Sequence, residues 1–161
     1  MKSYALLSCL GLVRLVCAGT YPVPHDEPVV SIKIPEKWKV TEHEEFVEGT
    51  TPDGTMHVLA LAVEGTKVAE SLGEGVRYIR NTGAIVIKAD SAKHETPTLK
   101  GKPVRSVSWD AHDQKGEIKL RCHVISGKND KPALLFFWGS VDAEKKYHRE
   151  VSQILETIET S

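Results

Sequence analysis

The chain has 161 residues, 40% of them hydrophobic and 27% charged, which is enough for one domain with a real core and excludes a disordered chain. Its formal net charge of −1 argues against a nucleic-acid-binding protein that relies on a basic surface. We therefore expect one globular domain without a nucleic-acid partner.

Residues 1–18 have the pattern of a secretory signal peptide. A positive start precedes an apolar run and small residues, and the pattern predicts cleavage after Ala18. The run is too short to cross a membrane, so we expect no transmembrane segment in the mature chain. Two alternatives stay open: a lipoprotein with its lipid anchor at Cys17, and a buried N-terminal helix. The signal predicts an exported protein, periplasmic or extracellular.

Residues 19–28 follow as an extended tether, because "TYPVPHDEP" holds three prolines and no core-forming run. The folded domain is expected to occupy residues 29–161. It opens with "VVSIKIP", an alternating strand that Pro35 ends. Trp38 follows among charged residues, and we expect it to return to the core while Glu36, Lys37 and Lys39 face water.

The middle of the chain predicts a hairpin and then a helix. "EEFVEGTTPDGTMHVLALAV" reads as two strands joined at the turn "TPDG". Residues 67–80 follow with one apolar helical face, and Asn81 and Gly83 suit the end of that helix. Gly73 and Gly75 weaken it by about 1 kcal/mol each relative to alanine.

The second half is mostly strand. "AIVIKA" is rich in β-forming residues, and "VRSVSWDA" and "EIKLRCHVIS" flank the loop "HDQKG" as a second hairpin. "ALLFFWG" is apolar on both faces, which predicts a central strand covered on both sides. The last element is an amphipathic helix that Asp142 can cap. The order of elements predicts an α+β fold, an antiparallel sheet with two helices packed against it.

Three stretches resemble the PsbP-like superfamily. They are the opening "IKIPEKWKV", the glycine-flanked turn in "LKGKPVRSVSWD", and the terminal unit "PALLFFWGSVDAEKKYHREVSQILETIE". The resemblance covers roughly residues 29–160, and the signal-like start favours the superfamily's exported bacterial branch. It implies a PsbP-like fold and a binding or accessory role, because the superfamily is not a recognised enzyme class and offers no catalytic residues to carry over.

Motifs for cofactor chemistry do not fit the chain. Gly73-Glu74-Gly75 lies inside a helical pattern, and the third glycine of a dinucleotide fingerprint would fall at Tyr78. Gly101-Lys102 is followed by Pro103, where a phosphate loop needs serine or threonine. Once residues 1–18 are removed Cys122 is the single cysteine left, and its strand pattern predicts a small buried side chain. We expect no cofactor and no enzymatic activity.

One sheet face is a candidate partner-binding surface. Arg105 and Trp109 share one parity on their strand, and Lys119, Arg121 and His123 are expected beside them across the "HDQKG" turn. A mixed basic and aromatic patch suits a protein partner. The alternative is an ordinary solvated face of an antiparallel sheet.

A second candidate is a metal site in "DAHD". Asp110, His112 and Asp113 could place two carboxylates and an imidazole around a hairpin turn. The alternative is a polar turn, since aspartate is common in turns. Two functions therefore follow: an exported, non-enzymatic binding or accessory protein with a protein partner at the cell envelope, of which an inhibitor or immunity protein is one version, or a protein that binds metal or a small ligand through surface histidines.

Overall fold

The computed structural model describes residues 18–65 and 67–160. The signal peptide and the anchor cysteine predicted at Cys17 lie outside the described residues, apart from Ala18. The strands are β1 (Ala18–Val23), β2 (Val30–Pro35), β3 (Lys39–Glu42), β4 (Phe46–Thr50), β5 (Met56–Ala62), β6 (Val86–Ile87), β7 (Lys93–Glu95), β8 (Thr98–Leu99), β9 (Lys102–Pro103), β10 (Arg105–Asp113), β11 (Gly116–Ser126), β12 (Pro132–Ser140) and β13 (Glu159–Thr160). The α-helices are α1 (Val68–Gly83) and α2 (Val141–Glu156), and short 3₁₀ turns span Ala89–Ser91 and Lys128–Asp130.

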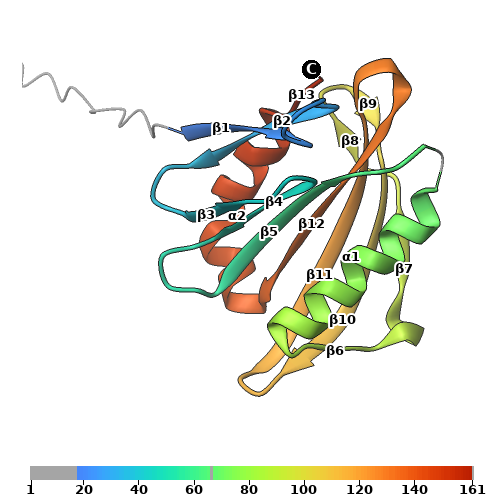
Figure 1. The fold of residues 1–161 in the computed structure, drawn as a ribbon. Helices are drawn as coiled ribbons and strands as arrows, with labels where there is room; N and C mark the ends of the chain where they lie inside the picture. Colours follow the sequence, from blue (N-terminus) through green and yellow to red (C-terminus); the bar gives the residue numbers. More distant parts are fainter. Residues whose placement is uncertain (1–17, 66, 161) are drawn as a thin grey trace, which may run out of the picture.

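One large antiparallel sheet forms the middle of the molecule, in the order β3-β4-β5-β12-β11-β10-β6, with β7 also paired to β10. Its central strand β12 lies between β5 and β11 and is buried from Ala133 to Gly139, as the doubly apolar sequence predicts. The two helices lie on opposite sides of this sheet (Figure 1). The predicted α+β class, with two helices packed on an antiparallel sheet, is confirmed.

The first side of the sheet is covered by α2 and by a small sheet in the order β1-β2-β13. Ile32 and Ile34 of β2 pack there with Phe137 of β12 and Ile154 of α2. Trp38 is buried in the same cluster at 3% exposure, while its neighbours Glu36, Lys37 and Lys39 are exposed, as predicted. Pro35 ends β2, so the chain turns and brings this aromatic side chain under α2.

The second side is covered by α1. Ile79 of α1 packs with Leu59 of β5, Leu134 and Phe136 of β12, and Leu120 of β11. The two glycines of α1, Gly73 and Gly75, have different surroundings. A Cβ on Gly75 would lie 2.5 Å from the Phe136 ring, whereas one on Gly73 would meet nothing within 4 Å. Gly75 therefore allows the helix to approach the sheet, a packing role that helix propensity alone does not show.

The N-terminal segment of the described chain differs from the expected tether. β1 pairs with β2 along its whole length, and Val23 is fully buried in the core. The physical reason is that β2 has a free edge, which an extended, proline-containing segment can pair with. The core therefore begins before residue 29.

Four local expectations are also corrected. The "AIVIKA" stretch contributes only the two residues of β6, and the unpredicted strand β3 pairs with β4. The hairpin loop is shorter than "HDQKG", since β10 runs to Asp113 and β11 starts at Gly116. Ser140, not Asp142, caps α2, because its Oγ accepts a hydrogen bond from the Ala143 N–H at 3.1 Å.

Neither helix among the described residues has the length and apolar character needed to cross a membrane. The free thiol of Cys122 is completely buried on the α1 side, and burial raises its pKa above its ordinary value. Its role is that of a small apolar side chain, as the alternation of β11 predicts.

Candidate functional site

The five residues predicted to form one partner-binding patch lie on two different faces of the sheet. Ala111 is paired with Ile118 across the β10–β11 hairpin, so odd residues of β10 stand opposite even residues of β11. Arg105 and Trp109 therefore point to the α1 side of the sheet. Lys119, Arg121 and His123 point to the α2 side. The predicted single patch is wrong. The hairpin turn is two residues long, and the pairing of β10 with β11 is shifted by one residue from the register that would place all five side chains on one face.

The three residues on the α2 side have partners within the molecule. Lys119 forms an ion pair with Asp110 on the neighbouring strand, and Arg121 reaches Glu144 of α2 at 3.5 Å. His123 packs edge-on against the Phe137 ring, and burial lowers its pKa to about 4. His123 is thus neutral at pH 7, so this surface is less basic than its sequence suggests.

The predicted metal ligands do not converge. Asp110 is held by Lys119, which lowers the pKa of the Asp110 carboxyl group. Asp113 points to the other face and accepts hydrogen bonds from the backbone N–H groups of Lys115 and Gly116 at 2.7 and 3.0 Å. Within residues 18–65 and 67–160, no three His, Cys, Asp or Glu side chains are grouped so that they could hold a metal ion. In "DAHD", the Asp113 carboxylate thus stabilises the hairpin turn and the Asp110 carboxylate forms the ion pair with Lys119.

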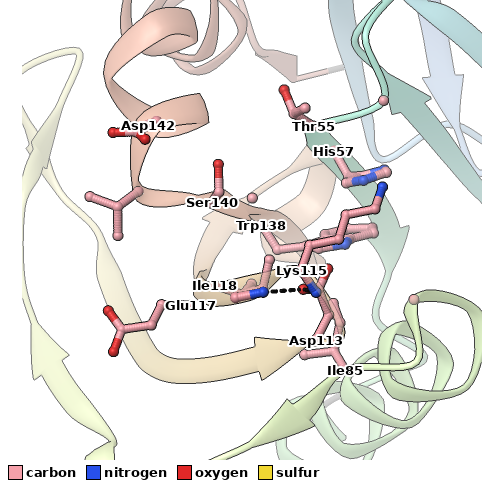
Figure 2. A pocket seen from close by; sticks show the side chains of 15 residues that line it. Thr55, His57, Ile85, Asp113, Lys115, Glu117, Ile118, Trp138, Ser140 and Asp142 are labelled. Carbon is pink, nitrogen blue, oxygen red and sulfur yellow. Dashed lines mark hydrogen bonds between the residues drawn. The ribbon is translucent and has the colours of Figure 1, made fainter.

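A pocket of about 470 Å³ lies at the end of the sheet where this hairpin turns. It is bounded by the β10–β11 turn, the end of α1, the start of α2, and the turn between β4 and β5. We name it the His57–Trp138 pocket after the two aromatic side chains in its wall (Figure 2). Its volume lies within the range of roughly 300–1,000 Å³ that is usual for small-molecule sites.

His57 and Trp138 are direct cross-strand neighbours on β5 and β12. Their rings stack with centroids 4.9 Å apart and an interplanar angle of 10°. His57 Nδ1 lies 3.1 Å from Thr50 Oγ1, which fixes the ring from a third strand, β4. Burial lowers the pKa of His57, so its imidazole is neutral at pH 7. The stack is a rigid wall built on three adjacent strands.

Ionisable side chains surround this wall. Lys115 extends from the hairpin turn toward His57, whereas Glu117 and Asp142 lie on the opposite side of the pocket (Figure 2). Gly54 and Gly116 line the pocket at positive φ, and a Cβ on either would meet no atom within 4 Å. These two glycines leave room at the pocket's edge while also forming the turns.

No pattern in the sequence predicts this pocket. His57 is a half-buried residue of an alternating strand, and Trp138 belongs to an apolar central strand. Their contact depends on the register between β5 and β12, which are separated by residues 63–131 of the chain. The alternation of "TMHVLALAV" would have placed His57 on one face with Leu59, but no local signal identifies the opposite residue.

No protein-family model matches the chain, and no curated protein matches its sequence. Solved structures do match its fold. A Bacteroides thetaiotaomicron protein has a TM-score of 0.52 at 14% identity; the match covers 83% of this chain and 45% of that one. The cyanobacterial PsbP protein CyanoP of Synechocystis has a TM-score of 0.51 at 9% identity over 96% of this chain and 99% of CyanoP. The chain therefore spans less than half of the Bacteroides protein but nearly all of CyanoP.

A third structure is LpqN of Mycobacterium tuberculosis, which is described as involved in cell envelope biogenesis. Its TM-score is 0.50 at 13% identity, and the match covers 88% of this chain and 90% of LpqN. Together these likenesses define the class of the protein by its architecture: it has the PsbP-like α+β fold. The resemblance seen in the sequence is confirmed at the level of the fold, which by itself does not assign a function.

Proposed function

We propose that this chain is an exported, non-catalytic binding protein that acts through a protein partner at the cell envelope, and that the His57–Trp138 pocket is where it engages that partner. The observation that carries the proposal is the construction of the pocket. A rigid aromatic wall stands beside the long, exposed side chain of Lys115, and apolar side chains line the space between them. Aromatic anchors within a polar rim are typical of recognition sites.

The polar groups of the pocket favour binding over catalysis. The Oδ1 atom of Asp113 accepts hydrogen bonds from two backbone N–H groups, and the His57 ring is held by Thr50 and Trp138. A general acid or base needs a titratable group that is free to exchange a proton, and burial lowers the pKa of His57 below its ordinary value. These groups are positioned to hold a ligand.

Two observations support an envelope location. The segment before β1 has the pattern of an export signal. LpqN, which shares the fold, is described as involved in cell envelope biogenesis. Cleavage after Ala18 and lipidation of Cys17 both leave Gly19 to Val23 of β1 intact, so either mature form keeps the pairing with β2. The mass of the mature N-terminal peptide distinguishes the two forms, and an uncleaved chain in the cytoplasm would contradict export.

Position-specific crosslinking in cells tests the partner. A photoreactive amino acid replaces Lys115 at the pocket, and in a matched variant it replaces Lys128, an exposed residue beyond the opposite end of β11. We expect one defined protein to crosslink at position 115 and not at position 128. Equal capture at both positions, or none at position 115, would overturn the proposal.

A further inference from the structure

We propose that the His57–Trp138 pocket binds a single carboxylate group carried on a small apolar body. The inference rests on the proposed function, because it names the chemistry recognised at the same site. Three features of the pocket support it: an indole N–H with no acceptor among the described residues, a cation with no ion pair among them, and apolar walls of suitable size.

The donor is the indole N–H of Trp138. Trp138 is only 5% exposed, and no described residue accepts a hydrogen bond from its Nε1. No fully buried side-chain nitrogen or oxygen among the described residues lacks a partner, so this Nε1 is accessible to solvent, and Trp138 lines the pocket. A Cβ built on Gly83, which also lines the pocket, would lie 3.8 Å from Nε1. An indole nitrogen can only donate, so the group it lacks is an acceptor.

Trp38 is a buried tryptophan of the same protein whose indole N–H does have an acceptor. It is buried to the same degree, and its Nε1 donates to Glu150 Oε2 at 2.6 Å. A carboxylate oxygen is thus the acceptor that this fold already supplies to one of its buried indoles. The Trp138 N–H, which is accessible from the pocket, offers the same donor to a ligand.

The cation is Lys115. Its side chain reaches toward His57 and the aromatic wall (Figure 2), and it forms no ion pair with residues in 18–65 or 67–160. Within the pocket, the ammonium group and the indole N–H lie on the side away from Glu117 and Asp142, while Asp113 lies beside Lys115 and its Oδ1 accepts two backbone hydrogen bonds. A carboxylate bound there accepts a charge-assisted hydrogen bond from the Lys115 ammonium group and a second hydrogen bond from the uncharged indole N–H of Trp138.

The remaining lining sets the selectivity. Ile85, Ile118 and Val141 supply apolar surface beside the aromatic wall, which suits a hydrocarbon body. Asp113, Glu117 and Asp142 add negative charge to the pocket, which disfavours a second negative charge on the ligand. We therefore expect a monocarboxylate to bind and inorganic phosphate to be excluded.

Two kinds of ligand present such a carboxylate: a free organic acid, and a partner chain through its C-terminal carboxylate. Three probes of matched shape separate them: N-acetyl-leucine, which imitates a chain terminus; isocaproate, which has a similar aliphatic body and the carboxylate but no peptide group; and N-acetyl-leucinamide, which lacks the carboxylate. Tighter binding of N-acetyl-leucine indicates a chain terminus, and tighter binding of isocaproate indicates a free acid.

The readout is the indole N–H region of the NMR spectrum of the protein, which holds one signal for each of the three tryptophans. The signal absent in Trp138→Phe is assigned to Trp138, and that of Trp38 is the internal control. We expect the carboxylate probes to move the Trp138 signal at millimolar concentration, with no shift from N-acetyl-leucinamide or phosphate. Lys115→Gln should weaken binding about tenfold, and Lys128→Gln should leave it unchanged.

Two results would overturn the inference: a Trp138 signal that neither carboxylate moves, or an amide that moves it as far as the acid does. The outcome is independent of the crosslinking experiment. A protein captured at position 115 without any response to carboxylates would leave the proposed function standing and refute this ligand class. A carboxylate response without a captured protein would retain the ligand class and refute the protein partner.

Discussion

The two faces of the central sheet are closed in different ways. On the α2 side the polar groups are paired: Trp38 donates to Glu150 at 2.6 Å, and the Tyr147 hydroxyl donates to Asp53 at 2.8 Å. Ser140 caps α2 on the same side. On the α1 side no side chain caps the helix, which contains two internal glycines. There the Trp138 N–H has no acceptor among the described residues.

This difference separates the part of the molecule that holds the fold together from the part that remains open to a ligand. Natural sequences satisfy buried polar groups almost everywhere, and departures concentrate at functional sites. The paired α2 side satisfies its polar groups within the protein, whereas at the pocket end of the α1 side the Trp138 N–H is accessible to solvent and to a ligand. The comparison makes predictions for variants on each side.

The largest expected effect concerns the two buried tryptophans. Trp38→Phe removes a hydrogen bond to a carboxylate and leaves Glu150, which is 18% exposed, with Lys37 alone. We expect the free energy of unfolding to fall by about 3 kcal/mol. Trp138→Phe keeps an aromatic ring against His57 and strands no acceptor, so we expect a loss of about 1 kcal/mol. Urea denaturation followed by circular dichroism measures both, and equal losses would contradict the comparison.

The next effect is on pH dependence, through His123 on the α2 side. Burial lowers its folded-state pKa from 6.5 to about 4, with Arg121 also lowering it and Glu95 on β7 opposing. Above pH 6.5 His123 is neutral in both states and has no effect. As the pH falls from 6.5 toward 4 the unfolded chain takes up the proton first, so stability declines by roughly 2 to 3 kcal/mol.

Unfolding measured across this pH range tests the assignment. His123→Gln should flatten the decline. His148→Gln, a change at an exposed histidine of α2, should leave the slope as it is. A slope that survives in His123→Gln would show that other groups cause it. The fall in stability as Asp53 is protonated belongs to lower pH, because its lysine and hydroxyl partners hold its pKa below its ordinary value.

Much of the fold could be predicted from local periodicity in the sequence. The alternation of β2, the double apolar character of β12 and the apolar stripe of α2 all report burial directly, since a side chain's neighbours follow from its position along one element. Trp38 could be placed for the same reason, because Pro35 fixes where the strand stops. β1 could not, because its pairing with β2 depends on a free sheet edge rather than on its own composition.

The candidate site depended on registers that the sequence does not encode locally. Had Ala111 faced Glu117, Arg105 and Trp109 would have shared a face with Lys119 and Arg121. Ala111 faces Ile118 instead, and this single step moves every side chain of the partner strand to the other face. The stacking of His57 on Trp138 is likewise set by a pairing between distant strands.

The two glycines of α1 give a smaller, matched test on the α1 side. Gly75→Ala forces a Cβ to within 2.5 Å of the buried Phe136 ring, so we expect a loss of about 2 kcal/mol from repacking. Gly73→Ala meets open space and should raise the free energy of unfolding by about 0.5 to 1 kcal/mol. Thermal or urea unfolding distinguishes the two signs. Stabilisation by both changes would mean that α1 does not rely on a close approach to β12.

The smallest expected effect concerns Arg121, which contacts Glu144 of α2 at 3.5 Å with half of its side chain exposed to solvent. Water and salt screen such a pair, so Arg121→Gln should change the free energy of unfolding by less than about 0.5 kcal/mol. The Arg121→Gln/Glu144→Gln double variant should match it and respond equally little to added salt. A loss well above this in the single variant would mean that the ion pair is shielded from water. The α2 side would then rely on charge as well as on the buried contacts of Trp38 and its helix.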